Sequence, residues 1–202
     1  MSHSRPARAA VLFVVIAAIA ATLGHQSPAS PSSPATAPSP VHLRHAEHRA
    51  ALGEADGAVP AGTTVFDDAV PGVARLDADL GDALRRAATA AAGAGVELNV
   101  DSGWRSPDYQ ERLLREAIAK YGSEDEAARW VATPGTSAHV SGDAVDIGPS
   151  RAAAWLSEHG AVYGLCRIYA NEPWHFELRP AAADHGCPPV YADPTQDPRM
   201  RE

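Results

Sequence analysis

Between residues 137 and 175 the chain carries four potential metal-site side chains on short segments that are interrupted by glycine and proline. His139 and Asp146 stand seven residues apart, so they cannot share one helical turn as the two histidines of an HExxH motif do. Gly142 lies between them and permits a turn that returns Asp146 toward His139. Glu172 and His175 flank a Pro-Trp pair further along. The fold therefore has to bring two separate segments together around these side chains.

These residue types predict a zinc hydrolase. Two histidines and one carboxylate fill three positions around Zn²⁺ and leave the fourth for a water, so His139, Asp146 and His175 are the predicted ligands of one Zn²⁺ per chain. Glu172 is placed to take the proton of that water as it attacks a peptide carbonyl. Arg105 follows a predicted strand in a loop with small neighbours, and it is the candidate for stabilising the oxyanion.

The rest of the pattern places helices early and short strands late. Leucines at i, i+4 and i+8 among alanines predict a helix over residues 75–92, and Pro107 begins another helix that runs to residue 120. Apolar and polar residues alternate over residues 96–100, which predicts a strand. Helices are also predicted over residues 124–131 and 151–159, and strands over residues 144–147, 165–169 and 174–178. This order favours an α+β fold with an antiparallel sheet over alternating βαβ units.

The N-terminal part has the pattern of an export signal. Arg5 and Arg8 precede 15 residues that are apolar apart from one threonine, which is shorter than a comfortable transmembrane helix. Residues 1–25 are therefore predicted to be a signal peptide or, if they are not cleaved, a membrane anchor. Residues 26–40 are rich in proline, serine and alanine and predict an extended linker. Residues 41–202 are predicted to form the zinc peptidase domain.

Charge and cysteine content limit the partners and the compartment. A formal net charge of −8 argues against a nucleic-acid partner, and it gives no support for binding an anionic membrane surface. Contact with a membrane is expected only through an uncleaved N-terminal anchor, and the protein is expected to be a monomer. Cys166 and Cys187 are the only cysteines, and export favours a disulfide between them over two buried thiols.

The residues also match the pattern of a known family. The pattern SxHxxGxAxD is met at Ser137, His139, Gly142, Ala144 and Asp146, ExxH at Glu172 and His175, and an SGWRS segment lies at residues 102–106. With these motifs the chain resembles the zinc D-Ala-D-Ala peptidases of the VanY/VanX type, within the LAS metallopeptidases, over residues 66–179. Three ordered blocks are a more specific signal than one short motif.

The resemblance implies a small antiparallel sheet flanked by helices. It also implies that His139, Asp146 and His175 are the zinc ligands, that Glu172 is the catalytic base and that Arg105 stabilises the transition state. It further implies that Ser137 and Gln110 contact the substrate. Trp174, between the predicted base and a predicted ligand, either lines the substrate pocket or is a core aromatic residue.

The function expected from motifs, export signal and linker together is that of an exported, cell-wall zinc peptidase. It would remove the C-terminal D-alanine from peptidoglycan stem peptides that end in D-Ala-D-Ala, as a secreted or membrane-anchored enzyme. A D-Ala-D-Ala dipeptidase and an endopeptidase of the L-Ala-D-Glu type remain alternatives, because the motifs around the zinc are shared. A non-catalytic wall-binding module is an alternative from another class, which intact Glu172 and Arg105 disfavour.

Overall fold

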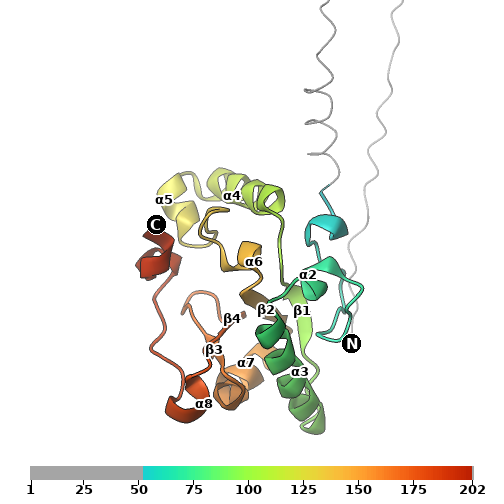
Figure 1. The fold of residues 1–202 in the computed structure, drawn as a ribbon. Coiled ribbons are helices and arrows are strands. Elements are labelled where there is room, and N and C mark those ends of the chain that lie inside the picture. Colours follow the sequence, from blue (N-terminus) through green and yellow to red (C-terminus); the bar gives the residue numbers. More distant parts are fainter. Residues whose placement is uncertain (1–51, 202) are drawn as a thin grey trace, which may run out of the picture. The chain divides into compact units, whose positions relative to one another are not determined.

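A computed structural model of the chain describes residues 52–201 (Figure 1). The predicted signal or anchor, the predicted linker and the first residues of the predicted peptidase domain lie outside this range. No helix among the described residues has the length and apolar character needed to cross a membrane.

The centre of the fold is a four-stranded antiparallel sheet. Its strands are β1 (Asn99–Ser102), β2 (Ala144–Gly148), β3 (Leu165–Arg167) and β4 (His175–Leu178), and their order across the sheet is β1-β2-β4-β3. The α-helices are α2 (Pro71–Ala74), α3 (Ala78–Gly93), α4 (Pro107–Tyr121), α5 (Glu124–Ala128), α6 (Ala138–Ser141), α7 (Ser150–His159) and α8 (Ala182–His185). Short 3₁₀ helices are η1 (Glu54–Asp56), η2 (Gly160–Tyr163), η3 (Pro194–Gln196) and η4 (Pro198–Arg201). The predicted α+β class is confirmed.

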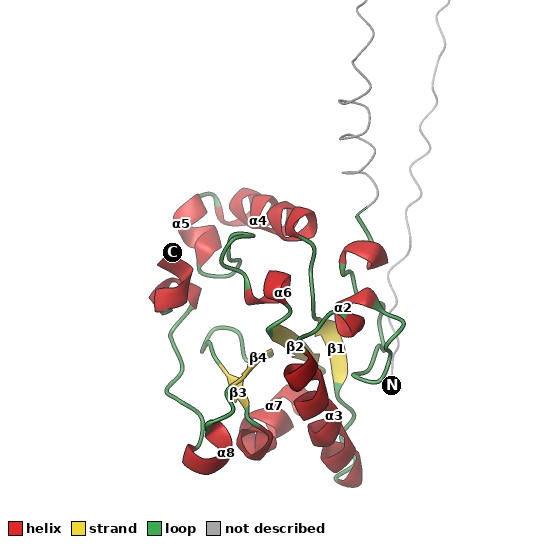
Figure 2. Ribbon diagram, in the orientation of Figure 1, coloured by secondary structure: helices red, strands yellow, loops and turns green. Residues whose placement is uncertain are grey.

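The hydrophobic core lies on one face of the sheet. Helix α3 contributes Leu80 and Leu84, helix α7 contributes Leu156, and an alanine-rich surface lets both helices pack closely. In Figure 2, α3 and α7 lie below the strands in the drawn orientation, and α4 and α6 lie above them. The helices thus flank the sheet, and the core face is separate from the face that carries the polar residues.

Strand alternation divides the sheet into these two faces. Successive side chains of a strand point to opposite sides, so Val145 and Phe176 enter the hydrophobic core while Asp146 and His175 face the other way. Asp146 and His175 are direct partners in the pairing of β2 with β4. The two central strands therefore place two predicted ligands side by side.

Four predicted elements differ from the observed ones by two or more residues. The helix predicted over residues 75–92 begins only at Ala78, after the capping residue Asp77, and the helix predicted over residues 124–131 ends at Ala128. The strand predicted over residues 96–100 begins only at Asn99, because Val96 and Leu98 bury their side chains in the core before the chain pairs with β2. The strand predicted over residues 165–169 ends at Arg167. Helices α2, α6 and α8 were not predicted. Helix α6 is a single turn that ends at Gly142, whose φ of 85° is one that glycine adopts readily.

The predicted disulfide is present and ties the C-terminal part to the sheet. Cys166 of β3 is bonded to Cys187, which follows helix α8. Cys166 is also the β-pairing partner of Glu177 in β4. The disulfide that holds the C-terminal segment is therefore formed by the residue that lies directly opposite Glu177 in the sheet.

Candidate metal centre

Three secondary-structure elements bring the predicted ligands together. His139 comes from α6, Asp146 from β2 and His175 from the first position of β4. One possible ligand atom from each of the three lies within 4.8 Å of the others, and all three residues are buried. The structure thus assembles the His-Asp-His set that the sequence predicts.

The backbone of a neighbouring loop fixes the orientation of His139. Its Nδ1 atom lies 2.8 Å from the carbonyl oxygen of Gly103, so Nδ1 carries the proton and Nε2 faces Asp146. Gly103 is required at this position, because a Cβ atom there would collide with the carbonyl of Gly72. Burial, together with the nearby charge of Arg105, lowers the pKa of His139. Its imidazole is therefore neutral and ready to act as a ligand.

His175 lies between two carboxylates. Its Nδ1 atom is 3.2 Å from Oδ1 of Asp146, and its Nε2 atom is 3.3 Å from Oε1 of Glu177. Burial alone would lower the pKa of His175, but the hydrogen bonds and charges of the two carboxylates raise it to about 9. Nδ1 is the atom that points into the cluster, and Nε2 is held by a protein acceptor on the other side of the ring.

Asp146 uses its two oxygens differently. Oδ1 faces both histidines, at 3.5 Å from Nε2 of His139 and 3.2 Å from Nδ1 of His175, whereas Oδ2 accepts a hydrogen bond of 2.9 Å from Nη2 of Arg105. Burial alone would raise the pKa of Asp146, but the hydrogen bond of His175 and the charge of Arg105 hold it well below the usual range. The carboxylate is thus ionised within the cluster.

Arg105 is held by three acceptors. Besides Asp146, its Nε donates to Ser102 Oγ at 2.8 Å and its Nη1 to Oε1 of Gln110 at 3.1 Å. Gln110 is only 1% exposed, and its amide nitrogen donates to the carbonyl of Ala132 at 2.9 Å. Gln110 therefore orients Arg105 in this structure, and the substrate contact expected of Gln110 stays a prediction.

Glu172 lies at the edge of the metal cluster. Its Oε2 atom is 3.8 Å from Nδ1 of His175, and the residue is 7% exposed. Burial raises the pKa of Glu172 to about 7, and the charge of Asp146 adds to this, whereas His175 and Arg105 oppose it. A carboxyl group with a pKa near neutrality is suited to accept and return a proton.

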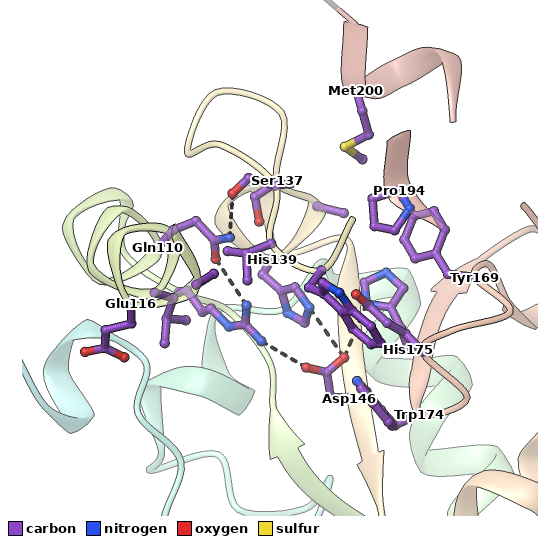
Figure 3. A pocket seen from close by; sticks show the side chains of 18 of the residues that line it. Gln110, Glu116, Ser137, His139, Asp146, Tyr169, Trp174, His175, Pro194 and Met200 are labelled. Atoms are coloured by element: carbon purple, nitrogen blue, oxygen red, sulfur yellow. Dashed lines mark hydrogen bonds and ion pairs between the residues drawn. The ribbon is translucent and has the colours of Figure 1, made fainter. Parts of the chain in front are cut away.

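A cavity of about 350 Å³ connects these residues (Figure 3). Ser137 and Trp174, both predicted to contact substrate, line it together with the three predicted metal ligands, Glu172 and Arg105. Trp174 is 40% exposed, so it lies at the rim of the cavity and not in the core. On the far side the cavity continues along α4 to Lys120 and to Trp130. The site is therefore open to an extended molecule.

Sequence reasoning missed Glu177 and the residues around it. Glu177 is 1% exposed and its carboxylate binds Arg179 and Arg199 as well as His175. One signal was available, because residues 175 and 177 of a strand share a face, so a carboxylate two residues after a ligand points to the same side of the sheet. No local pattern links Arg199 to this site, because the contact spans 22 residues.

A buried two-histidine, one-carboxylate cluster with an adjacent carboxylate and an arginine is the arrangement of a metallohydrolase site. The sequence profile of the VanY family, described as D-alanyl-D-alanine carboxypeptidase, matches residues 73–181. The chain belongs to this family, and the predicted resemblance is confirmed.

The chain is also similar to individual proteins. A D-alanyl-D-alanine carboxypeptidase of Enterococcus faecalis (strain ATCC 700802 / V583) is 32% identical, over 50% of this chain and 47% of the relative, so the chain spans about half the length of that protein. The LdcB LD-carboxypeptidase structure has a TM-score of 0.51 and 26% identity, over 63% of this chain and 70% of the other. The structure of a vancomycin resistance D,D-pentapeptidase VanY mutant in complex with Zn(II) has a TM-score of 0.48 and 30% identity, over 51% and 72%.

Proposed function

We propose that this protein is an exported zinc carboxypeptidase that releases the C-terminal D-alanine from peptidoglycan stem peptides. The observation that carries the proposal is the buried cluster of His139, Asp146 and His175, with Glu172 3.8 Å from a ligand atom in the same cavity. Membership of the VanY family supports the substrate class. The disulfide between Cys166 and Cys187 and the N-terminal sequence support export, because disulfides persist in oxidising compartments.

The residues fit Zn²⁺. Two imidazoles and a carboxylate are a donor set of catalytic zinc sites. In each histidine one ring nitrogen faces the cluster, and the other lies within hydrogen-bond distance of a protein oxygen, from Gly103 or Glu177. Such outer partners are typical of metal-binding histidines, because they fix the tautomer and the ring orientation. His139, Asp146 and His175 would therefore hold the ion.

Zn²⁺ bound there supplies a Lewis acid that polarises the scissile carbonyl and lowers the pKa of water. Glu172 accepts the proton of the attacking water and passes it to the leaving D-alanine amine. Arg105 carries five N–H donors, three of which meet protein acceptors, and it lines the cavity where negative charge develops on the carbonyl oxygen. Because Ser102, Gln110 and Asp146 hold the guanidinium, its position is set before the substrate arrives.

The shape of the cavity favours a peptide longer than a dipeptide. The cavity extends from the metal cluster along α4, past the apolar side chains of Leu113 and Ala117, toward Trp130. A free dipeptide would leave this part unused, whereas the body of a stem peptide would occupy it. This favours removal of a terminal residue from a longer peptide over cleavage of free D-Ala-D-Ala.

Release of D-alanine tests the proposal. The purified full chain, loaded with Zn²⁺, is incubated with a stem pentapeptide that ends in D-Ala-D-Ala, and free D-alanine is measured. We expect D-alanine release that stops on chelation and returns when Zn²⁺ is added back. The same peptide ending in L-Ala-L-Ala is the control for stereochemistry. Folded, zinc-loaded protein that releases no D-alanine from any such peptide would falsify the proposal.

Mass analysis of muropeptide digests separates the related activities. Loss of one alanine from the C-terminus identifies a carboxypeptidase, and release of a whole stem identifies an endopeptidase. Hydrolysis of free D-Ala-D-Ala with the muropeptides left intact identifies a dipeptidase. Binding to muropeptides without any change in their mass and without hydrolysis of free D-Ala-D-Ala would instead identify a wall-binding module.

A further inference from the structure

The last residues of the described chain return to the metal centre. We call residues 193–200 the tail; it follows Cys187 and lies beyond residues 73–181, which the family profile matches. Pro194 and Met200 of the tail line the same cavity as the metal cluster and lie opposite Ser137 and Gln110 in Figure 3. The tail thus forms one wall of the site.

Arg199 of the tail binds the carboxylate that supports His175. Its Nη1 atom lies 2.7 Å from Oε2 of Glu177, and its Nη2 atom lies 3.2 Å from Oε1. Two parallel hydrogen bonds from a guanidinium fix both the position and the plane of a carboxylate. Oε1 of Glu177 is also the atom that faces Nε2 of His175, at 3.3 Å. Arg199 therefore contacts the predicted metal ligand His175 through one intervening residue, Glu177.

A second contact path joins the tail to the same histidine. Asp197 is fully buried and accepts a hydrogen bond of 3.1 Å from the hydroxyl of Tyr169, and it also pairs with Arg199. The ring centroid of Tyr169 lies 5.1 Å from that of His175. The imidazole is thus held by Glu177 at its Nε2 edge and by Tyr169 at its ring, and both of these partners are bound by the tail.

We propose that Arg199 is a positioning residue of the metal centre, which orients His175 through Glu177 and so sets the affinity of the site for its metal. The proposal rests on the proposed function only in taking His175 as a metal ligand. Arg179 also binds Glu177, at 2.6 Å, but it lies only two residues further along the chain and is not part of the tail. Arg199 is the residue that connects the carboxylate to the tail. The tail is therefore a structural part of the site, although it lies outside the family match.

The tail has anchors that do not depend on Arg199. The disulfide at Cys187 fixes the chain before the tail, and Asp193 accepts a hydrogen bond of 3.1 Å from Nε of Arg129. A substitution at Arg199 therefore removes the contact with Glu177 while the start of the tail stays attached. This makes the proposal testable in a folded protein.

The experiment measures metal affinity in the full chain. Zn²⁺ dissociation constants are determined by chelator competition for wild type, Arg199→Met, Arg199→Lys and the control Arg115→Met, which makes the same change at an exposed arginine that pairs with Glu111 on α4. We expect Arg199→Met to weaken Zn²⁺ binding by about 10-fold or more, as changes in outer partners do. Arg199→Lys should recover part of the loss, and the control should bind as wild type does.

A spectroscopic reading separates positioning from a general loss of stability. In the Co²⁺-loaded protein, the visible absorption bands report the geometry of the ligands, and we expect Arg199→Met at saturating Co²⁺ to shift them relative to wild type. Unchanged Zn²⁺ affinity together with an unchanged Co²⁺ spectrum in folded Arg199→Met would overturn the proposal.

A second variant covers the case in which Arg199→Met does not fold. Glu177→Gln keeps the shape of the side chain but removes the charge that binds Arg199 and faces His175. Measured above pH 9, where no proton competes with the metal at His175 in either protein, it should show the same loss of Zn²⁺ affinity. Wild-type affinity of Glu177→Gln under these conditions would contradict the proposal. No peptide is needed for these measurements. If the wild-type protein binds no Zn²⁺, the proposed function fails. If the wild-type protein binds Zn²⁺ and hydrolyses the peptide, and Arg199→Met has the same Zn²⁺ affinity and Co²⁺ spectrum, only the role of Arg199 fails.

Discussion

Arg105 binds the oxygen of Asp146 that faces away from the two histidines. The distance from Nη2 to Oδ2 is 2.9 Å, and both side chains are largely buried. The arginine that is expected to stabilise the oxyanion is thus also an outer partner of a predicted metal ligand. In the proposed function, this one side chain connects the candidate metal cluster to the place where the substrate carbonyl reacts.

This double contact predicts a double defect in Arg105→Lys. A lysine keeps the charge but cannot bind Asp146, Gln110 and Ser102 at once, because it lacks the planar fork of the guanidinium. We expect kcat/KM for D-alanine release to fall by about 10²–10³-fold and Zn²⁺ affinity to fall by roughly 10-fold. Arg115→Lys is the matched control. A variant with full activity and full affinity would show that neither contact matters.

Glu172→Gln should separate catalysis from metal binding. The amide keeps the size of the side chain beside His175 but cannot accept the proton of water. We expect kcat to fall by about 10²–10⁴-fold, the range of general acid–base effects, while the Zn²⁺ dissociation constant stays close to that of wild type. Measured kcat and zinc content check this together. Retained hydrolysis in the zinc-loaded variant would exclude Glu172 as the base.

Metal binding should depend on pH through His175. The raised pKa of about 9 means that the metal-free protein holds a proton on His175 at neutral pH, which a metal must displace from Nδ1. Apparent Zn²⁺ affinity should therefore rise with pH, by up to about tenfold per unit for this one proton, and level off above about pH 9. His139, whose pKa is lowered, contributes no proton there.

Calorimetry in buffers of different ionisation enthalpy measures this proton release directly. At pH 8 we expect about one proton per Zn²⁺ from His175. In Glu177→Gln one cause of the raised pKa is removed, so the affinity should level off at a lower pH. An affinity that does not change between pH 6 and pH 8 would contradict the assignment of His175 as a protonated ligand in the metal-free protein.

Removal of the disulfide should lower thermal stability. Closing the loop between Cys166 and Cys187, which are 21 residues apart, stabilises the fold by about 3 kcal/mol in the loop-entropy model. For a domain of this size the double variant Cys166→Ala/Cys187→Ser should lose roughly 6–12 °C in Tm. Scanning calorimetry checks the shift. A reductant should lower the Tm of wild type but leave that of the variant unchanged.

The sequence predicted those parts of the site in which residue type and local spacing carry the information. His139, Asp146, Glu172 and His175 lie in two short segments with the chemistry of a zinc centre, and the structure brings them together. The α+β class also followed from local periodicity, since the leucine repeat of α3 marks a face that the sheet then covers.

The parts that were not predicted depend on contacts between distant segments. Gly103 supports His139 across 36 residues, and Arg199 reaches Glu177 across 22. Gly103 lies in the SGWRS segment, which does not indicate its partner, and Arg199 is an ordinary tail residue by its neighbours. Only the folded chain shows both contacts. The start of β1 was misplaced for a related reason. The alternation of apolar and polar residues indicates that Val96 and Leu98 are buried, but pairing with β2, a distant segment, decides that the strand begins at Asn99.

The pairing of Asp146 with His175 sets a limit on how the chain can vary in length. Side chains alternate along β4, so a shift of one residue in its pairing with β2 would point His175 into the hydrophobic core and bring Phe176 to the metal cluster. Insertions or deletions are compatible with the site only outside the paired residues and outside the short segment from Glu172 to His175. Homologous enzymes should therefore differ in the length of their connecting loops while keeping an unbroken spacing from Glu172 to the end of β4.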